Sequence, residues 1–169
     1  MLRRVFEVVI RDEGPVDLPR VDAVLAAAFG GEDEVRLVRA LRSAGELACS
    51  LVAELEGTIV GHVAFEALRV EPEPASPVWA LAPLAVLPAR QRQGLGSKLV
   101  SAGLERARAA GVGAVVVLGD PAYYERFGFR GELVSALRTP WDGPHLMGLL
   151  LHDGPVPAGT ARYPDAFFG

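Results

Sequence analysis

Hydrophobic and polar positions alternate in two neighbouring stretches of the chain. Residues 46–55 and residues 58–68 each place apolar side chains at every second position, and Glu56-Gly57 separates the two stretches. Such alternation on both sides of a short turn predicts a β-hairpin. Residues 4–11, which read RVFEVVIR, are rich in β-branched side chains and predict one more strand.

Two other stretches are almost continuously apolar, which is typical of strands in the middle of a sheet. They are residues 78–86, VWALAPLAV, and residues 114–118, AVVVL. Pro83 lies inside the first of them. Because proline lacks the N–H group that a central strand needs, we expect a bulge there or a separation from a neighbouring strand. A last strand is expected over 145–151, and an edge strand from residue 129 onward.

Hydrophobic residues at helical spacing predict helices between the strands. The expected helices cover residues 17–29, 32–44, 94–110 and 121–127, the last of them ended by Gly128. A helix between two buried strands favours a parallel pair with a right-handed crossover. We therefore predict an α/β fold with a mixed sheet of roughly seven strands and helices on both faces.

The chain has 169 residues, about the size of one domain. We expect a single domain over residues 1–169. The aromatic residues Tyr163, Phe167 and Phe168 suggest that the end of the chain, residues 154–169, packs on this domain as a C-terminal extension.

Composition narrows the classes of function. The chain has one cysteine, and its three histidines show no metal-ligand spacing, so we expect no metal. The formal net charge of −4 argues against general nucleic-acid binding. The longest apolar run is far too short to span a membrane, and charges near the N-terminus do not suit a signal peptide. We expect a soluble cytoplasmic protein without nucleic-acid or membrane partners.

Residues 87–100, LPARQRQGLGSKLV, lead from a buried strand into a helix. The first N–H groups of a helix have no partner within it, and glycines such as Gly94 and Gly96 allow a ligand to come close. This junction could hold a phosphate or pyrophosphate, with nearby charge from Arg90, Arg92 and Lys98, or it could be an ordinary loop. Neither the dinucleotide fingerprint nor the P-loop pattern matches the stretch.

The segment Gln91-Arg92-Gln93-Gly94-Leu95-Gly96 resembles the Q/R-x-x-G-x-G/A signature of the GCN5-related N-acetyltransferase (GNAT) superfamily. In that family a strand of the form L-x-V-x-P comes directly before the signature, and here residues 84–88 read LAVLP. A Y-x-x-x-G-F motif is expected later, and residues 124–129 read YERFGF. Residues 118–129 and 159–167 are also similar to a bacterial subgroup of N-acetyltransferases known only by prediction.

The resemblance implies that the fourth and fifth strands splay apart and receive acetyl-CoA as co-substrate. Backbone groups of residues 84–86 would pair with its pantetheine arm, and the N–H groups of residues 92–97 would hold its pyrophosphate. The predicted cofactor-binding residues are Leu84, Ala85, Val86, Gln91, Arg92, Gln93, Gly94, Leu95, Gly96, Ser97 and Tyr123.

The resemblance also implies acetyl transfer by direct attack of a primary amine on the thioester, within a ternary complex. Tyr124 matches the family's tyrosine, which acts as general acid or stabilises the thiolate, although a tyrosine packed in the core is the alternative. No acid lies in residues 78–86, where some relatives carry a base. Glu66 and Asp120 are the best-placed candidate bases, but a solvated or capping acid is the favoured interpretation of each.

The acceptor is left open by the sequence. We expect a small-molecule amine, and the alternatives are a protein or peptide amine, or a module that binds acyl-CoA without catalysis. Dimers are common among similar proteins, so a homodimer is also open.

Overall fold

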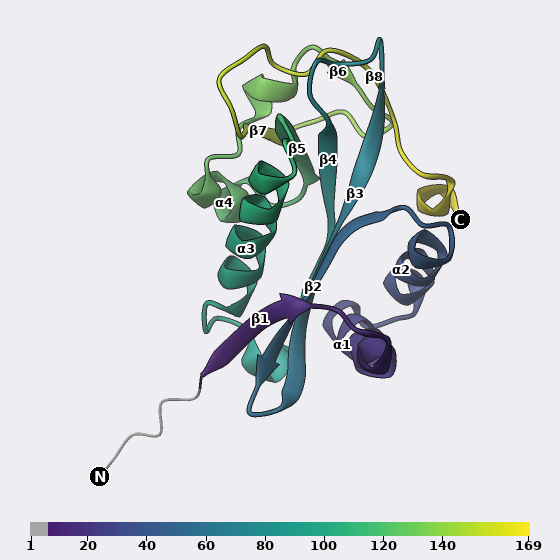
Figure 1. Cartoon of the computed structure of the whole chain (residues 1–169), viewed down its shortest axis with the longest axis vertical. Coiled ribbons are helices and arrows are strands. Elements are labelled where there is room, and N and C mark those ends of the chain that lie inside the picture. The colour runs from purple at the N-terminus through teal and green to yellow at the C-terminus, as the bar shows by residue number, and fades with distance from the viewer. Residues whose placement is uncertain (1–6) are drawn as a thin grey trace.

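An open β-sheet forms the centre of the computed structural model, which describes residues 7–169 (Figure 1). Its main path runs β1-β2-β3-β4-β5-β7, and all neighbours in it are antiparallel except the parallel pair β4 and β5. The mixed sheet and the parallel pair are as predicted. The strands are β1 (Val8–Asp12), β2 (Leu47–Leu55), β3 (Thr58–Glu71), β4 (Val78–Val86), β5 (Ala114–Leu118), β6 (Leu137–Arg138), β7 (Leu146–Leu150) and β8 (Gly159–Arg162).

Helices cover both faces of the sheet, as predicted (Figure 1). The helices α1 (Leu18–Phe29) and α2 (Asp33–Ser43) lie on one face, and α3 (Leu95–Ala109) lies on the other. The short helix α4 (Pro121–Tyr124) follows β5. Five 3₁₀ turns complete the described chain: η1 (Pro15–Asp17), η2 (Pro88–Arg90), η3 (Glu125–Phe127), η4 (Gly131–Val134) and η5 (Asp165–Phe168). Within residues 7–169, none of the helices has the length and hydrophobicity that crossing a membrane requires.

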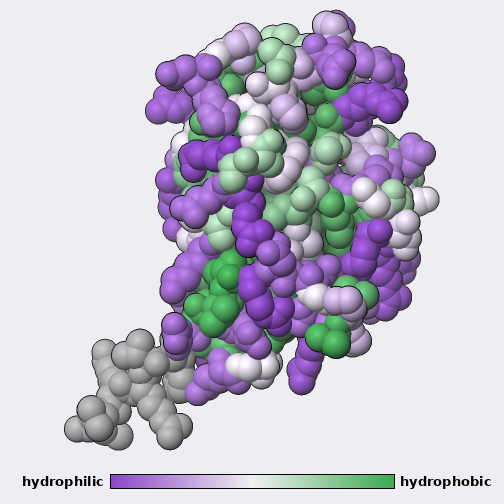
Figure 2. Space-filling model, in the orientation of Figure 1, coloured by the Kyte–Doolittle hydropathy of each residue, from purple (hydrophilic) through white to green (hydrophobic). Residues whose placement is uncertain are grey.

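The core has a layer on each side of the sheet. Leu95, Leu99 and Leu104 of α3 pack against Phe65 and its neighbours on one side, while Val21 and other residues of α1 and α2 pack on the opposite side. Gly103 lets α3 approach closely, because a Cβ atom there would overlap the Phe65 ring. On the face seen in Figure 2, hydrophilic residues dominate and hydrophobic ones form separate patches.

β4 separates from β5 halfway along its length. The two strands are paired from Val78–Ala114 to Leu81–Val117, and no pairing joins them beyond that point. Pro83 lies in a bulge there, because Ala82 and Pro83 together stand opposite Ala64 of β3. The predicted bulge and separation are therefore confirmed. Among the described residues, no strand pairs with the β5 side of residues 82–86.

Two features near the C-terminus differ from the prediction. The edge strand expected from residue 129 is wrong: Arg130 forms one isolated bridge with Gly148, and the chain then turns through η4. The turn buries Val134 against β7, which extended backbone would not do. The sequence also gave no sign of β8, which pairs with β3 and β6. At the other terminus, residues 4–6 of the predicted first strand lie outside the described residues.

The C-terminal extension contacts the body of the domain at three places. β8 pairs with residues 69–71 of β3, η5 packs on α2, and the rings of Tyr163, Phe167 and Phe168 surround Trp141. The shortest ring-to-ring distance in this group joins Trp141 and Tyr163, whose centroids are 4.7 Å apart.

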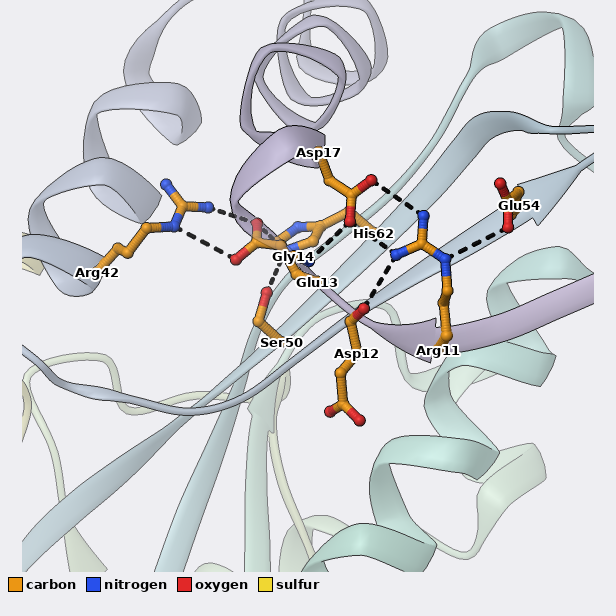
Figure 3. A network of polar contacts seen from close by, with 9 residues as sticks. All are labelled: Arg11, Asp12, Glu13, Gly14, Asp17, Arg42, Ser50, Glu54 and His62. Carbon is orange, nitrogen blue, oxygen red and sulfur yellow. Dashed lines mark hydrogen bonds and ion pairs between the residues drawn. The ribbon is translucent and has the colours of Figure 1, made fainter.

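A network of polar contacts joins β1 and η1 to α2 and to strands β2 and β3 (Figure 3). Arg11 donates to Asp17 at 2.7 Å and to Glu54 at 3.3 Å, and Arg42 donates to Glu13. Asp17 stands at the start of α1, but its carboxylate accepts from Arg11 and from the N–H group of Gly14. Asp17 would suit a helix cap by its residue type and position, but its side chain does not cap α1.

Candidate functional site

A groove of about 550 Å³ opens between the separated half of β4 and the beginning of α3. It brings together the predicted cofactor-binding residues except Ala85 and Gln93, and it adds two arginines that were not in that set. The lining residues are Leu84, Val86, Arg90, Gln91, Arg92, Gly94, Leu95, Gly96, Ser97, Tyr123 and Arg126.

The loop directly before α3 has two residues with left-handed backbone. Arg92 has φ of +64° and Gly94 has φ of +81°. Glycine adopts this conformation freely, whereas for arginine it costs on the order of 1 kcal/mol. Alternating backbone of this kind, followed by the free N–H groups of a first helical turn, makes a concave surface that binds anions. The loop geometry thus favours a negatively charged ligand.

Positive charge surrounds the groove. The lining includes the arginines Arg90, Arg92 and Arg126 and no carboxylate. Arg126 packs over the Tyr123 ring, with its guanidinium carbon 4.3 Å from the ring centroid, and its Nε donates to the Tyr123 carbonyl oxygen at 3.1 Å. Arg126 was not predicted from the sequence. Its spacing of three residues from Tyr123, within the helix expected over 121–127, was the available signal, because such pairs share one helical face.

Two predicted residues hold the groove together by contacts with neighbouring protein groups. The Gln91 side-chain amide donates to the Val86 carbonyl oxygen at 3.1 Å, which ties the loop to the end of β4. Gly96 faces Tyr123, because a Cβ atom built on Gly96 would lie 2.7 Å from the Tyr123 hydroxyl oxygen. A glycine is therefore needed at position 96 for the tyrosine to reach its place in the groove wall.

Ala85 and Gln93 do not line the groove. The Ala85 side chain is buried in the layer of α1, on the opposite side of β4. Gln93 is exposed beside the groove.

Tyr124 lies in the core behind Tyr123. Its ring meets the Tyr123 and Phe129 rings edge to face, and it packs so closely on Gly119 that a Cβ atom there would come within 2.5 Å of it. Burial, with a smaller contribution from Tyr123, raises the pKa of Tyr124 to about 12. A phenol in this setting keeps its proton at neutral pH.

Glu66 is fully buried, in β3 next to Ala80 of β4. The interpretation of Glu66 as a solvated acid is therefore wrong. Neither of its carboxylate oxygens has a hydrogen-bond partner. Burial raises the pKa of Glu66 well above its ordinary value. Buried carboxyl groups with raised pKa values cluster at functional sites.

Asp120 caps a helix, as one of the two readings of the sequence predicted. Its carboxylate accepts from the N–H group of Ala122 at 3.0 Å, in the first turn of α4. Elsewhere in residues 7–169, no three side chains of His, Cys, Asp or Glu come together as a metal-binding group.

A comparison with protein families finds the acetyltransferase (GNAT) family over residues 18–129. The chain belongs to this family. The match covers both the loop at α3 and the tyrosine pair of α4. The N-acetyltransferase resemblance inferred from the sequence motifs, and the fold that it implied, are confirmed.

Relatives of this GNAT chain are similar over most of its length. An uncharacterized N-acetyltransferase of Escherichia coli K12, YhbS, is 44% identical over 135 residues, which are 79% of this chain and 80% of that protein. The crystal structure of YhbS in complex with CoA covers 100% of this chain and 96% of its own, with a TM-score of 0.92 and 36% identity.

A second GNAT structure comes from Brucella melitensis and contains acetyl-CoA. It covers 95% of this chain and 98% of its own, with a TM-score of 0.81 and 36% identity.

Proposed function

We propose that this chain is an acetyl-CoA-dependent N-acetyltransferase that acetylates the primary amine of a small molecule. The observation that carries the proposal is the groove at α3. There the left-handed residues Arg92 and Gly94 and the first turn of α3 lie beside an edge of β4 with which no strand of residues 7–169 pairs. A pyrophosphate attached to an extended arm is the ligand that such a pair of features suits.

Different parts of the groove suit the pyrophosphate and the pantetheine arm of acetyl-CoA. The N–H groups of residues 92–97, with Arg90, Arg92 and Arg126 around them, would hold the pyrophosphate. The free backbone of residues 84–86 would pair with the pantetheine arm as an added strand. This places the thioester near the bulge at Pro83, where a backbone N–H group would stabilise the oxyanion that forms on it.

Two buried residues supply the proton transfers of the proposal. Glu66 takes a proton from the acceptor ammonium, and the free amine attacks the thioester carbon. As the carbon–sulfur bond breaks, the nitrogen loses its second proton. Tyr124 either donates its own proton to the departing thiolate and regains one from the nitrogen, or stabilises the thiolate by a hydrogen bond while that proton goes to solvent. Burial raises the pKa of Glu66, so its carboxylate holds a proton more strongly than an exposed carboxylate does.

The test is thiol release from acetyl-CoA by the purified protein, measured with a colorimetric thiol reagent over a panel of small amines and an amine-bearing peptide. Turnover with a small amine above the amine-free rate supports the proposal. Turnover with the peptide alone would favour a protein acetyltransferase. Tight acetyl-CoA binding without turnover for any amine would favour an acyl-CoA-binding module. A cytoplasmic location and a homodimer remain predictions.

A further inference from the structure

A second cavity lies over β4 and β5 on the sheet face opposite α3, and it has a volume of about 150 Å³. Its floor is made by Ala80 and Ala82 of β4 with Val116 and Leu118 of β5, and rings close it from above. All of its lining side chains are apolar or aromatic: Ala80, Leu81, Ala82, Val116, Leu118, Trp141, Tyr163 and Phe167.

The cavity reaches the point where β4 and β5 separate. Leu81 and Val117 are the last residues that pair, and Ala82 and Leu118 are the next ones along the two strands. The groove at α3 begins at Leu84, two residues beyond Ala82 on the same strand. Two strand residues span roughly 7 Å, so the two hollows approach one another at the bulge.

One buried anion-forming group stands beside this cavity. Glu66 pairs with Ala80 of the floor, its side chain is fully buried, and both of its carboxylate oxygens lack a hydrogen-bond partner. Burial, with a smaller contribution from Glu66, raises the pKa of Tyr163 to about 12, which places this cavity residue within electrostatic reach of the carboxyl group. A buried acceptor without a partner is unfavourable unless a ligand supplies the donor.

We propose that this cavity holds the acceptor, and that the acceptor is a primary amine with one compact apolar body and no second charge. The inference rests on the proposed function and names its substrate class. The amine nitrogen lies toward the bulge, and the apolar body lies among Leu118 and the rings of Trp141, Tyr163 and Phe167. Glu66 lies beside the floor residue Ala80. An apolar cavity of about 150 Å³ accommodates one six-membered ring. A second ammonium group would lie against apolar walls without a counter-charge, which is strongly unfavourable.

The acceptor class is tested with amines of matched size. Pentylamine and 1,4-diaminobutane have equally long chains and differ in whether the far end is a methyl or an ammonium group, and benzylamine adds a ring. We expect kcat/KM for pentylamine and benzylamine to exceed that for 1,4-diaminobutane at least tenfold. Equal or better turnover of 1,4-diaminobutane would overturn the inference and leave the acetyltransferase function intact.

A variant at the cavity mouth tests the location. Leu118 lines the cavity but is 49% exposed, so a larger side chain there fills the mouth without overpacking the core. We expect Leu118→Trp to lower kcat/KM for benzylamine at least tenfold and leave the KM for acetyl-CoA within twofold. Val9→Trp, at a similarly exposed aliphatic residue of β1, is the control and should change neither. An unchanged kcat/KM in Leu118→Trp would overturn the inference.

Binding of benzylamine in the presence of CoA, followed by ligand-observed NMR, separates the two proposals. Binding that Leu118→Trp removes, with no thiol release for any amine, would support the cavity and overturn the transfer function. Absence of both binding and turnover would overturn the inference.

Discussion

Tyr124 and Tyr123 are adjacent in sequence but have different surroundings. Tyr123 lines the groove and supports Arg126, whereas Tyr124 packs in the core on Gly119 and Phe129. A group that must keep its proton until a thiolate leaves benefits from burial, because burial disfavours the ionised phenol. The surroundings of the two residues therefore suit binding for Tyr123 and proton donation for Tyr124.

Removing the Tyr124 hydroxyl tests this division. We expect Tyr124→Phe to lower kcat at least tenfold, because general acid catalysis typically contributes about 10²–10⁴-fold. The KM for acetyl-CoA should stay within twofold, since the ring packing is kept. Tyr123→Phe, the matched change in the groove wall, should affect that KM more than kcat. Steady-state thiol-release kinetics checks both, and an unchanged kcat in Tyr124→Phe would rule out the acid role.

Glu66 lowers the stability of the fold as the pH rises. Its pKa is raised in the folded state, so above about pH 4.5 the unfolded chain loses this proton more readily than the folded chain does. Stability is therefore lost with increasing pH, and a residue that cannot ionise removes that loss. We therefore expect the stability of Glu66→Gln relative to the parent protein to increase from pH 5 to pH 8.

Urea unfolding at pH 5 and at pH 8 measures the stability of Glu66→Gln relative to the parent protein. Glu105→Gln, a change of an exposed carboxyl group on α3, is the control and should alter stability little at either pH. If the free energy of unfolding changes by the same amount between pH 5 and pH 8 in Glu66→Gln and in the parent protein, the account is contradicted.

The sequence placed Gly94, Gly96 and Tyr123 together beside a strand end, because a motif fixes their position relative to that strand, and all three line the groove. Their binding roles, and the acid role of Tyr124, stay predictions. Arg126 and the burial of Glu66 were missed for a physical reason. Both depend on which side chains from distant segments pack beside them, and periodicity along one strand or helix does not specify that.

At the scale of elements, the polar network of Figure 3 connects the first helix pair to the sheet. Arg11 of β1 bridges Asp17, at the start of α1, and Glu54 of β2. His62 of β3 is fully buried and bonds to Ser50 at 2.8 Å, and burial together with the charge of Arg42 lowers its pKa to about 3. Because the unfolded chain binds this proton more readily, His62 reduces stability as the pH falls below about 6.5.

Asp17 responds to acid in its own pH window. The hydrogen bond from Arg11, and then that from Gly14, lowers the pKa of Asp17 from its ordinary value of 3.8 to about 2. Asp17 therefore stabilises the fold fully above about pH 3.8, and this stabilisation is lost as the pH falls toward about 2. We expect Asp17→Asn to lower the free energy of unfolding by about 1–2 kcal/mol at pH 7, and by less at pH 2.5.

Chemical denaturation at these two pH values checks the prediction. Asp33→Asn is the control, because its ion pair with Arg36 is exposed on the surface and should contribute little. An equal loss of stability in Asp17→Asn at pH 7 and pH 2.5 would show that the carboxylate charge is not the stabilising feature.

Elements with a strong periodic signal were predicted close to their observed bounds, including the hairpin, the two buried strands and the three long helices. The errors fall after residue 128. There the strands β6 and β8 are only two and four residues long, too short for a period to be recognised. β8 pairs with β3, which is distant in the sequence, and β6 pairs with β8. A pattern within one segment does not indicate such distant partners.

At the scale of the whole molecule, the separation of β4 from β5 organises both hollows. The groove at α3 lies on one side of the bulge, and the apolar cavity under the C-terminal extension lies on the other. A donor in the first and an acceptor in the second would meet at Pro83. Pro83 was the position that the sequence marked as incompatible with a regular central strand.

The most direct test of this account is calorimetric titration of acetyl-CoA into the protein and into Gly96→Asp. The new carboxylate would enter the arginine-lined groove and displace Tyr123. Gly31→Asp is the control, because it adds the same charge on an exposed residue with open space around it. We predict that the parent protein and Gly31→Asp bind acetyl-CoA with Kd values within twofold, and that Gly96→Asp weakens binding at least a hundredfold while its Tm stays within a few degrees. Undiminished binding by a folded Gly96→Asp protein would contradict the account.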